Sequence, residues 1–410
     1  QEVADGGSFL INCHYKEEEL EEYIPGQVKK YIADHNIRLY VIDALAIGKE
    51  IGLNNKTSTI LQAAFFRLAN IIPIEEARHL MKEAARISYH KKGDKIVRMN
   101  YDAIDRGIDD VIEVKIPEQW TNAEYKPLDS RLLPDRQEVT DYVVNIQKPV
   151  TDQQGNKLPV SAFVPYADGS FPSGSTAHER RGVATEVPFW KPENCIQCNL
   201  CSYVCPHAVI RPAVMTSEEK ANAPDNMDTL PMNGMSGYHF AVTISAVDCT
   251  GCGSCVGVCP GKMQQKALEM CPVKEHDARQ DYFDYGKTLP IKQEVTAKFK
   301  ESTIKGSQLK RPLKEFSGAC AGCGETPYAK LVTQLYGERM YIANATGCSS
   351  IWANSSPSTE YAATPEGKGP AWANSLFEDA AEYGYGMLLA EKAIREIAQK
   401  LNKIEHLDLT

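Results

Sequence analysis

The sequence has 410 residues, of which 43% are hydrophobic and 24% charged, and its formal net charge is −9. This length allows about two to four domains, and the composition is typical of soluble globular proteins. An acidic chain without a basic block argues against nucleic-acid binding, and no apolar run approaches the roughly 18 residues of a membrane span.

Residues 1–120 alternate between strand and helix patterns. Strands are expected at 7–12 and 37–44, and the second is a nearly continuous apolar run typical of a parallel strand buried on both faces. Helices are expected over 17–35 with an interruption at Pro25, over 58–72 and over 73–88. These patterns predict an open α/β layer.

Residues 121–185 are rich in Pro, Gly, Asp and Ser, which predicts a small irregular connecting domain with few long elements. A flexible linker is the alternative. Ordered structure is favoured because residues 141–147 and 160–167 carry apolar side chains worth burying.

Thirteen cysteines are too many for a reducing cytosol unless most of them bind metal. All but Cys13 and Cys271, which we expect to be ordinary thiols, fall into three groups. Two groups repeat the pattern C-x2-C-x2-C-x3-C-P of two-cluster ferredoxins, in which the fourth cysteine of each run ligates the other cluster. One 4Fe–4S cluster is therefore assigned to Cys195, Cys198, Cys201 and Cys259, and the other to Cys249, Cys252, Cys255 and Cys205.

Zinc is the alternative metal, since thiolates bind it equally well. Pairs of zinc ligands would not, however, require a third cysteine and a Cys-Pro step in both runs. Gly251, Gly253 and Gly257 are expected to let backbone N–H groups approach the cluster sulfides. His207 is expected at the surface, with cluster tuning as the alternative, and residues 206–248 are expected to be an insertion.

In residues 276–410 the α/β pattern resumes, with a strand expected at 339–345 and a long helix at 375–401. The third cysteine group lies in this part of the chain. It comprises Cys320, Cys323 and Cys348, after which the sequence has no further cysteine. Three thiolates fall short of the four that a cubane takes. A fourth ligand must then come from outside this chain, or one iron stays open, and a zinc site would have the same deficit.

The motifs "CAGCGETPYAK", "NATGCSSIWA" and "GPAWANSLFEDAAEYGYGM", together with the two ferredoxin runs, resemble the pyruvate:ferredoxin (flavodoxin) oxidoreductases, a thiamine-dependent 2-oxoacid oxidoreductase family. "GGSFLIN" and "NNKTSTILQAAFF" resemble the γ-type domain of that family, and "ERRGVA" its connecting domain. The resemblance implies a multidomain α/β protein with an inserted ferredoxin-like α+β domain carrying two 4Fe–4S clusters. The implied domains are a γ-type α/β domain at 1–120, a connecting domain at 121–185, the ferredoxin-like domain at 186–275 and the start of a thiamine-binding α/β domain at 276–410.

The same resemblance implies an enzyme that oxidatively decarboxylates pyruvate with coenzyme A to acetyl-CoA and CO2, and passes electrons to ferredoxin or flavodoxin. It further implies a cytoplasmic homodimer that binds thiamine diphosphate and Mg2+, and a third 4Fe–4S cluster on Cys320, Cys323, Cys348 and a cysteine outside this chain. The Gly-Asp-Gly thiamine–magnesium motif of the family is missing, so we expect the chain to be the middle of a longer polypeptide and inactive alone. Another 2-oxoacid substrate and a non-catalytic ferredoxin-type protein are the alternatives, and the third cysteine group argues against the latter.

Four further residues are candidate cofactor contacts. By resemblance, Glu325 lines the thiamine cavity, although a carboxylate at the start of a helix would also favour the helix dipole. Thr346 is assigned to the same cofactor. Asn54 and Asn55, in a turn before a helix, are placed to meet coenzyme A phosphates or simply to cap that helix. No catalytic residue is identified.

Overall fold

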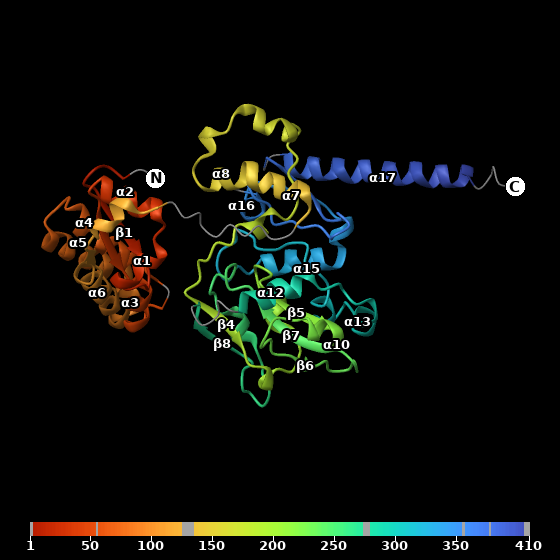
Figure 1. Cartoon of the computed structure of the whole chain (residues 1–410), viewed down its shortest axis with the longest axis horizontal. Helices are drawn as coiled ribbons and strands as arrows, with labels where there is room; N and C mark the ends of the chain where they lie inside the picture. The colour runs from red at the N-terminus through yellow and green to blue at the C-terminus, as the bar shows by residue number, and fades with distance from the viewer. Residues whose placement is uncertain are drawn as a thin grey trace. The chain divides into compact units, whose positions relative to one another are not determined.

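In the computed structural model, the chain divides into two compact units, Gln1–Arg131 and Leu132–Thr410, which are considered separately (Figure 1). The structure describes residues 3–54, 56–124, 135–273, 279–354, 357–376 and 379–405. Among these residues, no helix is both long and apolar enough to cross a lipid bilayer.

The first unit is built on a three-stranded sheet in the order β1–β2–β3, comprising Ser8–Asn12, Arg38–Ile42 and Ile112–Val114. The central strand β2 pairs in parallel with β1, and every residue of β2 after Arg38 is buried. This confirms the predicted buried parallel strand. The antiparallel strand β3 was not predicted, because three residues are too few to show a period of two.

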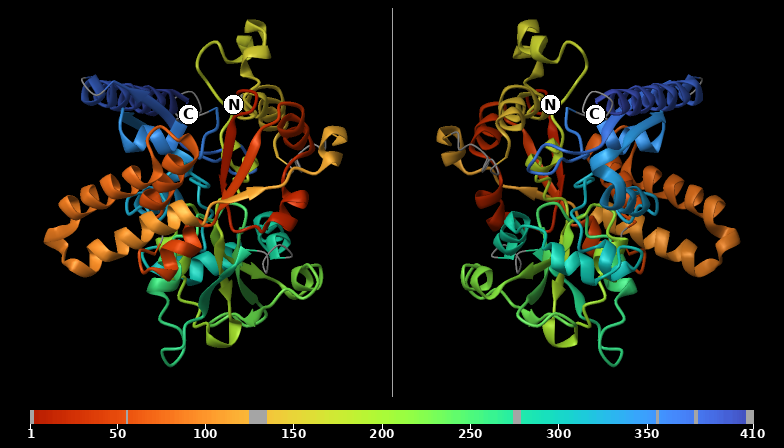
Figure 2. Two further views of the ribbon diagram at one scale, coloured as in Figure 1. Left: turned by 90° about the vertical axis from the view of Figure 1, so that its left-hand side faces the viewer. Right: turned by 90° about the vertical axis from the view of Figure 1, so that its right-hand side faces the viewer.

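Helices pack around this sheet. They are α1 (Leu20–Tyr23), α2 (Gly26–Asp34), α3 (Ala44–Glu50), α4 (Ser58–Ala69), α5 (Ile74–Tyr89) and α6 (Asp94–Asp109), with 3-10 turns at Glu17–Glu19, His90–Lys92 and Glu118–Asn122. Pro25 separates α1 from α2, as predicted. Helices α5 and α6 run side by side (Figure 2), and α6 also packs closely on α4 because Gly107 has no side chain. A Cβ atom on Gly107 would lie 2.4 Å from the carbonyl oxygen of Ile60.

The second unit begins with short helical segments. Helix α7 (Gln137–Tyr142) continues through a π-helical turn at Val143–Gln147 into α8 (Lys148–Thr151), and 3-10 turns follow at Gly155–Lys157, Val160–Tyr166 and Ser175–His178. Val143 and Ile146 are buried, as expected, whereas Val160 is 88% exposed. The prediction of burial over 160–167 is therefore wrong for most of this turn. Tyr166 is an exception, because its ring packs against that of Tyr142 at a centroid distance of 5.1 Å.

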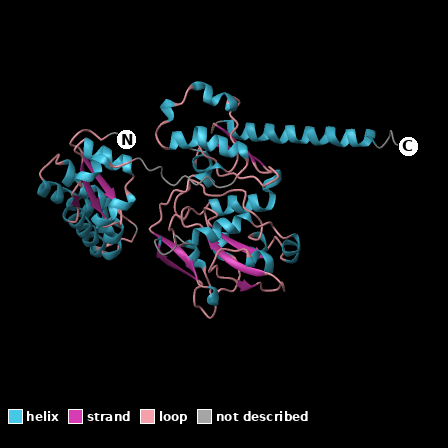
Figure 3. Cartoon of the chain, in the orientation of Figure 1, coloured by secondary structure: helices cyan, strands magenta, loops and turns pink. Residues whose placement is uncertain are grey.

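Two small antiparallel sheets form the lower part of this unit (Figure 3). One pairs β4 (Glu186–Trp190) with β8 (Leu268–Pro272), and the other has the order β5–β7–β6, from Ile210–Met215, His239–Ile244 and Leu230–Pro231. Short helices lie at α9 (Leu200–Val204), α10 (Ser217–Ala221) and α11 (Ser254–Val258). Residues 206–248, expected to be an insertion, thus supply an entire sheet of the core.

The rest of the unit is α/β. Its helices are α12 (Gln280–Thr288), α13 (Gln293–Lys298), α14 (Ile304–Ser307), α15 (Thr326–Tyr336), α16 (Cys348–Asn354) and α17 (Ala380–Glu405), with a 3-10 helix at Gly337–Arg339. Another 3-10 helix, Pro192–Asn194, lies earlier in the unit, between β4 and α9. Strands β9 (Tyr341–Ala345) and β10 (Ala371–Ser375) pair in parallel, and α17 packs against both. The predicted strand at 339–345 is confirmed as β9. The helix predicted at 375–401 is confirmed as α17 from Ala380 onward, whereas Ser375 belongs to β10.

Candidate metal centre

Each ferredoxin-type run forms a loop followed by one short helix, α9 or α11, and the two helices contact each other. Equivalent positions in the two loops have positive φ: 60° at Gln197 and 66° at Gly251, then 62° at Asn199 and 73° at Gly253. Gly251 and Gly253 therefore supply a left-handed backbone that glycine adopts without strain. Gly257 lies inside α11 instead, so the role predicted for it is not seen.

The first run achieves the same loop without glycine, because side-chain hydrogen bonds offset the strain. Gln197 Nε2 donates to the carbonyl oxygen of Pro231 at 2.8 Å, and Gln197 Oε1 accepts from the backbone N–H of Asn233 at 2.8 Å. Asn199 Nδ2 donates to the carbonyl oxygen of Lys305 at 3.0 Å. Asn is among the residues that tolerate the left-handed region best.

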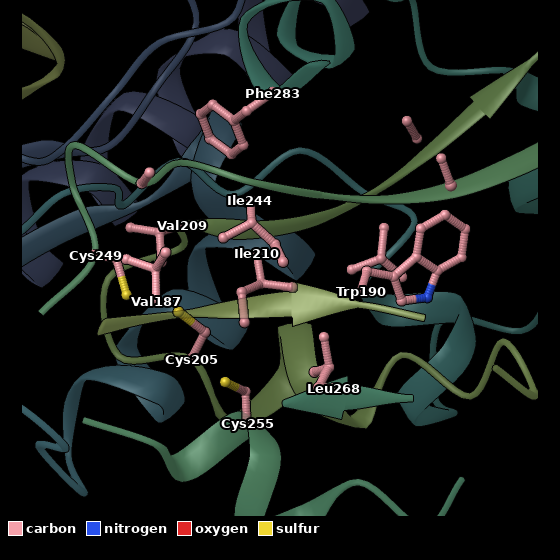
Figure 4. Close-up of a cluster of buried hydrophobic side chains, with 14 of the residues drawn as sticks. Val187, Trp190, Cys205, Val209, Ile210, Ile244, Cys249, Cys255, Leu268 and Phe283 are labelled. Atoms are coloured by element: carbon pink, nitrogen blue, oxygen red, sulfur yellow. The ribbon is translucent and has the colours of Figure 1, made fainter. Parts of the chain in front are cut away.

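The two loops surround two separate cavities. One is lined by Cys195, Cys198, Cys201 and Cys259, and is closed by Trp190 and Phe240. The other is lined by Cys205, Cys249, Cys252 and Cys255. In each cavity the fourth cysteine of one run meets the first three of the other, which is the arrangement of the crossed assignment. Figure 4 shows the sulfur atoms of Cys205, Cys249 and Cys255 gathered beside Val187.

Backbone N–H groups point at several of these sulfur atoms. The N–H groups of Gln197 and Gly251 donate to Cys195 Sγ and Cys249 Sγ at 3.4 Å each, one at the same position in each run. Ala267 N–H donates to Cys259 Sγ at 3.3 Å. Hydrogen bonds of this kind favour the thiolate form and tune the potential of a bound cluster.

Burial determines the protonation of these thiols in the metal-free protein. It raises the pKa of Cys195, Cys201 and Cys255, and raises that of Cys249 to about 12, with neighbouring cysteines adding to the effect. Metal binding must therefore release protons here. Among the described residues, no three His, Cys, Asp or Glu side chains form a group that would hold a single metal ion.

The third cysteine group lies in two neighbouring segments. Cys320 and Cys323 occupy the loop before α15, and Cys348 is the first residue of α16. The two segments meet, because Ala319 packs against the buried cluster around Trp352 of α16. Cys320 and Cys348 are exposed. The Cys323 thiol has a lowered pKa: burial raises it, but hydrogen bonds from the N–H groups of Glu325 and Thr326, at the start of α15, outweigh burial.

The loop of the third group also abuts the second cavity. Gly322 has φ +73°, and a Cβ atom placed on it would lie 3.6 Å from Cβ of Cys252 and 3.7 Å from Oγ of Ser254. The Cys320–Cys323 loop is therefore in van der Waals contact with the binding loop of the second cavity.

His207 contradicts the expectation of a surface histidine. Its side chain is 3% exposed and lines the second cavity, with Nδ1 3.1 Å from the carbonyl oxygen of Ser317. Burial lowers its pKa to about 4. The sequence carries no sign of this, because Ser317 lies 110 positions further along the chain.

A buried ion pair near the third group was also missed. Lys314 Nζ lies 3.5 Å from a carboxylate oxygen of Glu360, and 5.2 Å from the ring centroid of Trp352. Burial lowers the pKa of Lys314 and raises that of Glu360, because each charge is removed from water. No local pattern links two residues so far apart in sequence.

The candidate cofactor contacts make fewer interactions with the rest of the protein than the cysteines do. Glu325 is the exposed N-cap residue of α15 and its side chain makes no capping hydrogen bond, while Thr346 is exposed just after β9. Asn54 has a left-handed φ of 54° in the turn before α4, and Asn55 lies outside the described residues. Thr57, at the N-cap of α4, makes no side-chain capping bond, so the capping alternative finds no support at this residue.

Comparison with known proteins accounts for most of the chain. A family model described as pyruvate ferredoxin/flavodoxin oxidoreductase matches residues 1–109, one described as a 4Fe-4S dicluster domain matches 194–263, and one described as a domain of unknown function matches 130–184.

Three curated relatives align over nearly the whole chain. The chain is 46% identical to a pyruvate-flavodoxin oxidoreductase of Enterobacter agglomerans over 95% of its own length and 32% of the relative's. It is 46% identical to a pyruvate:ferredoxin oxidoreductase of Moorella thermoacetica (98% and 34%), and 42% identical to a pyruvate dehydrogenase [NADP(+)] of Cryptosporidium parvum (98% and 22%). The chain therefore spans about a third of the length of the first two relatives.

Proposed function

This chain belongs to the pyruvate:ferredoxin/flavodoxin oxidoreductase family, and on that premise we propose that it carries the electron-transfer part of a pyruvate oxidoreductase. The complete enzyme would convert pyruvate and coenzyme A to acetyl-CoA and CO2, and pass electrons to ferredoxin or flavodoxin. Pyruvate is proposed as substrate because the relatives are named for it. A homodimer is proposed from the resemblance of the sequence motifs.

The observation that carries this proposal is the pair of four-cysteine cavities. Each offers four thiol groups and inward N–H donors, a donor set that fits a 4Fe–4S cluster, and the first has an apolar wall. When bound, such clusters supply one-electron transfer at low potential. The role of the chain is to hold the two sites at a fixed separation through the contact between α9 and α11.

The third cysteine group gives the proposed route a direction. Cys320, Cys323 and Cys348 would hold a third cluster with a ligand from outside this chain. Their loop contacts Cys252, a residue of the second cavity, through Gly322. Electrons would therefore enter at the third group, pass the site of Cys205, Cys249, Cys252 and Cys255, and leave through the site of Cys195, Cys198, Cys201 and Cys259.

The organic cofactors are proposed at the remaining candidates. Glu325 and Thr346 flank Cys323 and Cys348 in the sequence, so a thiamine diphosphate–Mg2+ site beside them would lie next to the third cluster. Both residues are exposed, and the Glu325 side chain makes no capping hydrogen bond that would compete. Coenzyme A is proposed to meet Asn54 and Asn55.

The cluster assignment is tested by anaerobic reconstitution. The chain should bind about eight iron and eight sulfide in its two ferredoxin-type sites, with cubane EPR signals on reduction. Stoichiometric zinc in place of iron would contradict the proposal. The complete enzyme should reduce ferredoxin with pyruvate far faster than with other 2-oxoacids, and a preference for another 2-oxoacid would change the substrate but not the class.

The third group is tested by Cys348→Ser in the complete enzyme, with Cys271→Ser as a matched control from outside the three groups. Cys348→Ser should leave both ferredoxin-type EPR signals intact and abolish pyruvate-dependent ferredoxin reduction, because the first acceptor is lost. Near-normal reduction would show that the third group consists of structural thiols, and would favour a simple ferredoxin-type carrier.

A further inference from the structure

Lys330 is a lysine buried in the middle of α15. Its side chain is 1% exposed, and its amino group points at the C-terminal end of α9. There Nζ donates hydrogen bonds to three carbonyl oxygens, those of Ser202, of Tyr203 at 3.2 Å and of Cys205 at 3.2 Å.

Three donated hydrogen bonds require three hydrogens on Nζ, so this geometry is that of the ammonium form. The pKa of Lys330 is lowered to about 8, chiefly by burial, although the neighbouring Cys205 and Cys201 thiols raise it. Taking a lysine charge out of water costs several kcal/mol unless it is compensated. Carbonyl groups at the C-terminal end of α9, among them that of Ser202, which also accepts from the N–H of Cys205, provide part of this compensation.

Two other cations of this region face carboxylates. The half-buried Arg211 donates to Glu315, and the buried Lys314 lies 3.5 Å from Glu360. The hydrogen bonds of Lys330 among the described residues go to backbone carbonyls instead. Its charge is therefore available to interact with whatever negative charge lies beside α9.

That position lies between the two four-cysteine cavities. Cys201 lines the first cavity and Cys205 the second, and Ser202 and Tyr203 lie between them in the sequence. Nζ donates to the carbonyl oxygen of Cys205 itself, whereas on the other side it donates to that of Ser202, the neighbour of Cys201. A thiolate-bound 4Fe–4S cluster is anionic and becomes more negative on reduction, so a nearby buried cation stabilises the reduced form.

We propose that Lys330 is a positioning residue that holds the turn between the two cluster sites, and that its charge raises the reduction potential of both clusters, more strongly at the Cys205 site. The inference rests on the cluster sites of the proposed function. It makes α15, which follows the loop of Cys320 and Cys323, the helix that tunes the potentials along the electron path.

The test is an EPR-monitored redox titration of the iron-loaded protein and its variants. Lys330→Met removes the charge and the donors, whereas Lys330→Gln removes the charge and keeps an amide donor. Lys310→Gln is the matched control, because Lys310 pairs with Glu301 outside the cluster sites. The signal of the Cys205 site is identified as the one lost in Cys252→Ala.

Both Lys330 variants should shift both midpoint potentials to more negative values. At the wild-type midpoint, the ratio of reduced to oxidised cluster should fall at least about threefold at the Cys205 site and less at the other. The Lys310→Gln control should not shift. If Lys330→Met fails to fold, Lys330→Gln carries the test.

Unchanged potentials in a cluster-loaded Lys330→Gln protein would overturn the proposal, and so would an equal shift in Lys310→Gln. A shift in Lys330→Met alone would assign the effect to hydrogen bonding and overturn the role of the charge. Absence of cubane signals from the wild-type protein would instead refute the proposed function, so the two failures are distinguishable.

Discussion

Single charged residues inside the second unit acquire their partners from distant parts of the chain. Lys314 and Glu360 are both buried, at 2% and 0% exposure, and face each other at 3.5 Å. Glu315 accepts from Arg211 and lies 3.4 Å from Lys287. A charge in such a place is tolerated only while its partner is present.

Replacing Lys314 by Met should lower the free energy of unfolding by about 3–5 kcal/mol, because it leaves the Glu360 carboxylate buried without a counter-charge. The double variant Lys314→Met/Glu360→Gln should recover most of that loss. Urea denaturation measures both. Lys191→Met, which breaks the more exposed pair with Glu269, is the control and should cost far less than Lys314→Met, because water screens that pair. Equal losses in the single and double variants would contradict the interpretation.

Glu315 should make stability depend on pH. Burial raises the pKa of its carboxyl group, but Lys287 and Arg211 outweigh burial and bring the pKa to about 2, below its unfolded value. A lowered pKa stabilises the fold above the unfolded pKa, by roughly 3 kcal/mol for a shift of this size, and the contribution is lost as the pH falls toward 2.

Glu315→Gln should therefore destabilise the protein strongly at neutral pH and progressively less below about pH 4.5. Denaturation curves of the wild-type and variant proteins at several pH values measure the difference between their free energies of unfolding. A difference that stays constant down to pH 3 would contradict the assignment.

At the scale of elements, α9 and α11 show how two different sequences build the same loop. Gly251 and Gly253 reach positive φ without cost, whereas Gln197 and Asn199 reach it with the help of side-chain hydrogen bonds. Each loop thereby directs its first three cysteines into one cavity. The helix that follows carries the fourth cysteine into the other cavity.

The crossed arrangement predicts which variants share a phenotype. Cys205→Ala should lose the same EPR signal as Cys252→Ala, because both residues line the second cavity. Cys198→Ala, in the run of Cys205 itself, should lose the other signal. If Cys205→Ala instead matched Cys198→Ala, each run would hold its own cluster and the crossed ligation would be wrong.

At the scale of the whole molecule, the two units have separate cores. In the first unit, one cluster of buried residues includes Leu39 of β2, and a second cluster includes Ile60 of α4. In the second, the largest core includes Cys205, Cys249 and Cys255 among its buried residues. Metal binding should therefore contribute to the stability of the second unit alone.

Iron removal by an anaerobic chelator should raise amide hydrogen exchange in residues 186–273 and leave residues 3–124 unchanged, because a bound cluster stabilises only the fold that binds it. Mass spectrometry of peptides from the two units provides the measurement and its internal control. Increased exchange in both units would show that their stabilities are coupled. That result would contradict the independence of the two cores.

The sequence by itself determined the family, the alternation of strand and helix in the first unit, and the division of eight cysteines into two runs. These features are local: a period, a breaker such as Pro25, or a spacing of three residues is complete within a short window. The helix at 375–401 and the strands at 37–44 and 339–345 were predictable for the same reason.

Only the tertiary structure decided which surfaces those elements would share. It buried His207 against Ser317, paired Lys314 with Glu360, placed Gly322 against Cys252, and directed Lys330 at the turn between the two cavities. It also folded residues 206–248 into the sheet β5–β7–β6. Each of these contacts joins residues distant in sequence, and burial and charge pairing depend on what packs around a side chain rather than on its neighbours along the chain.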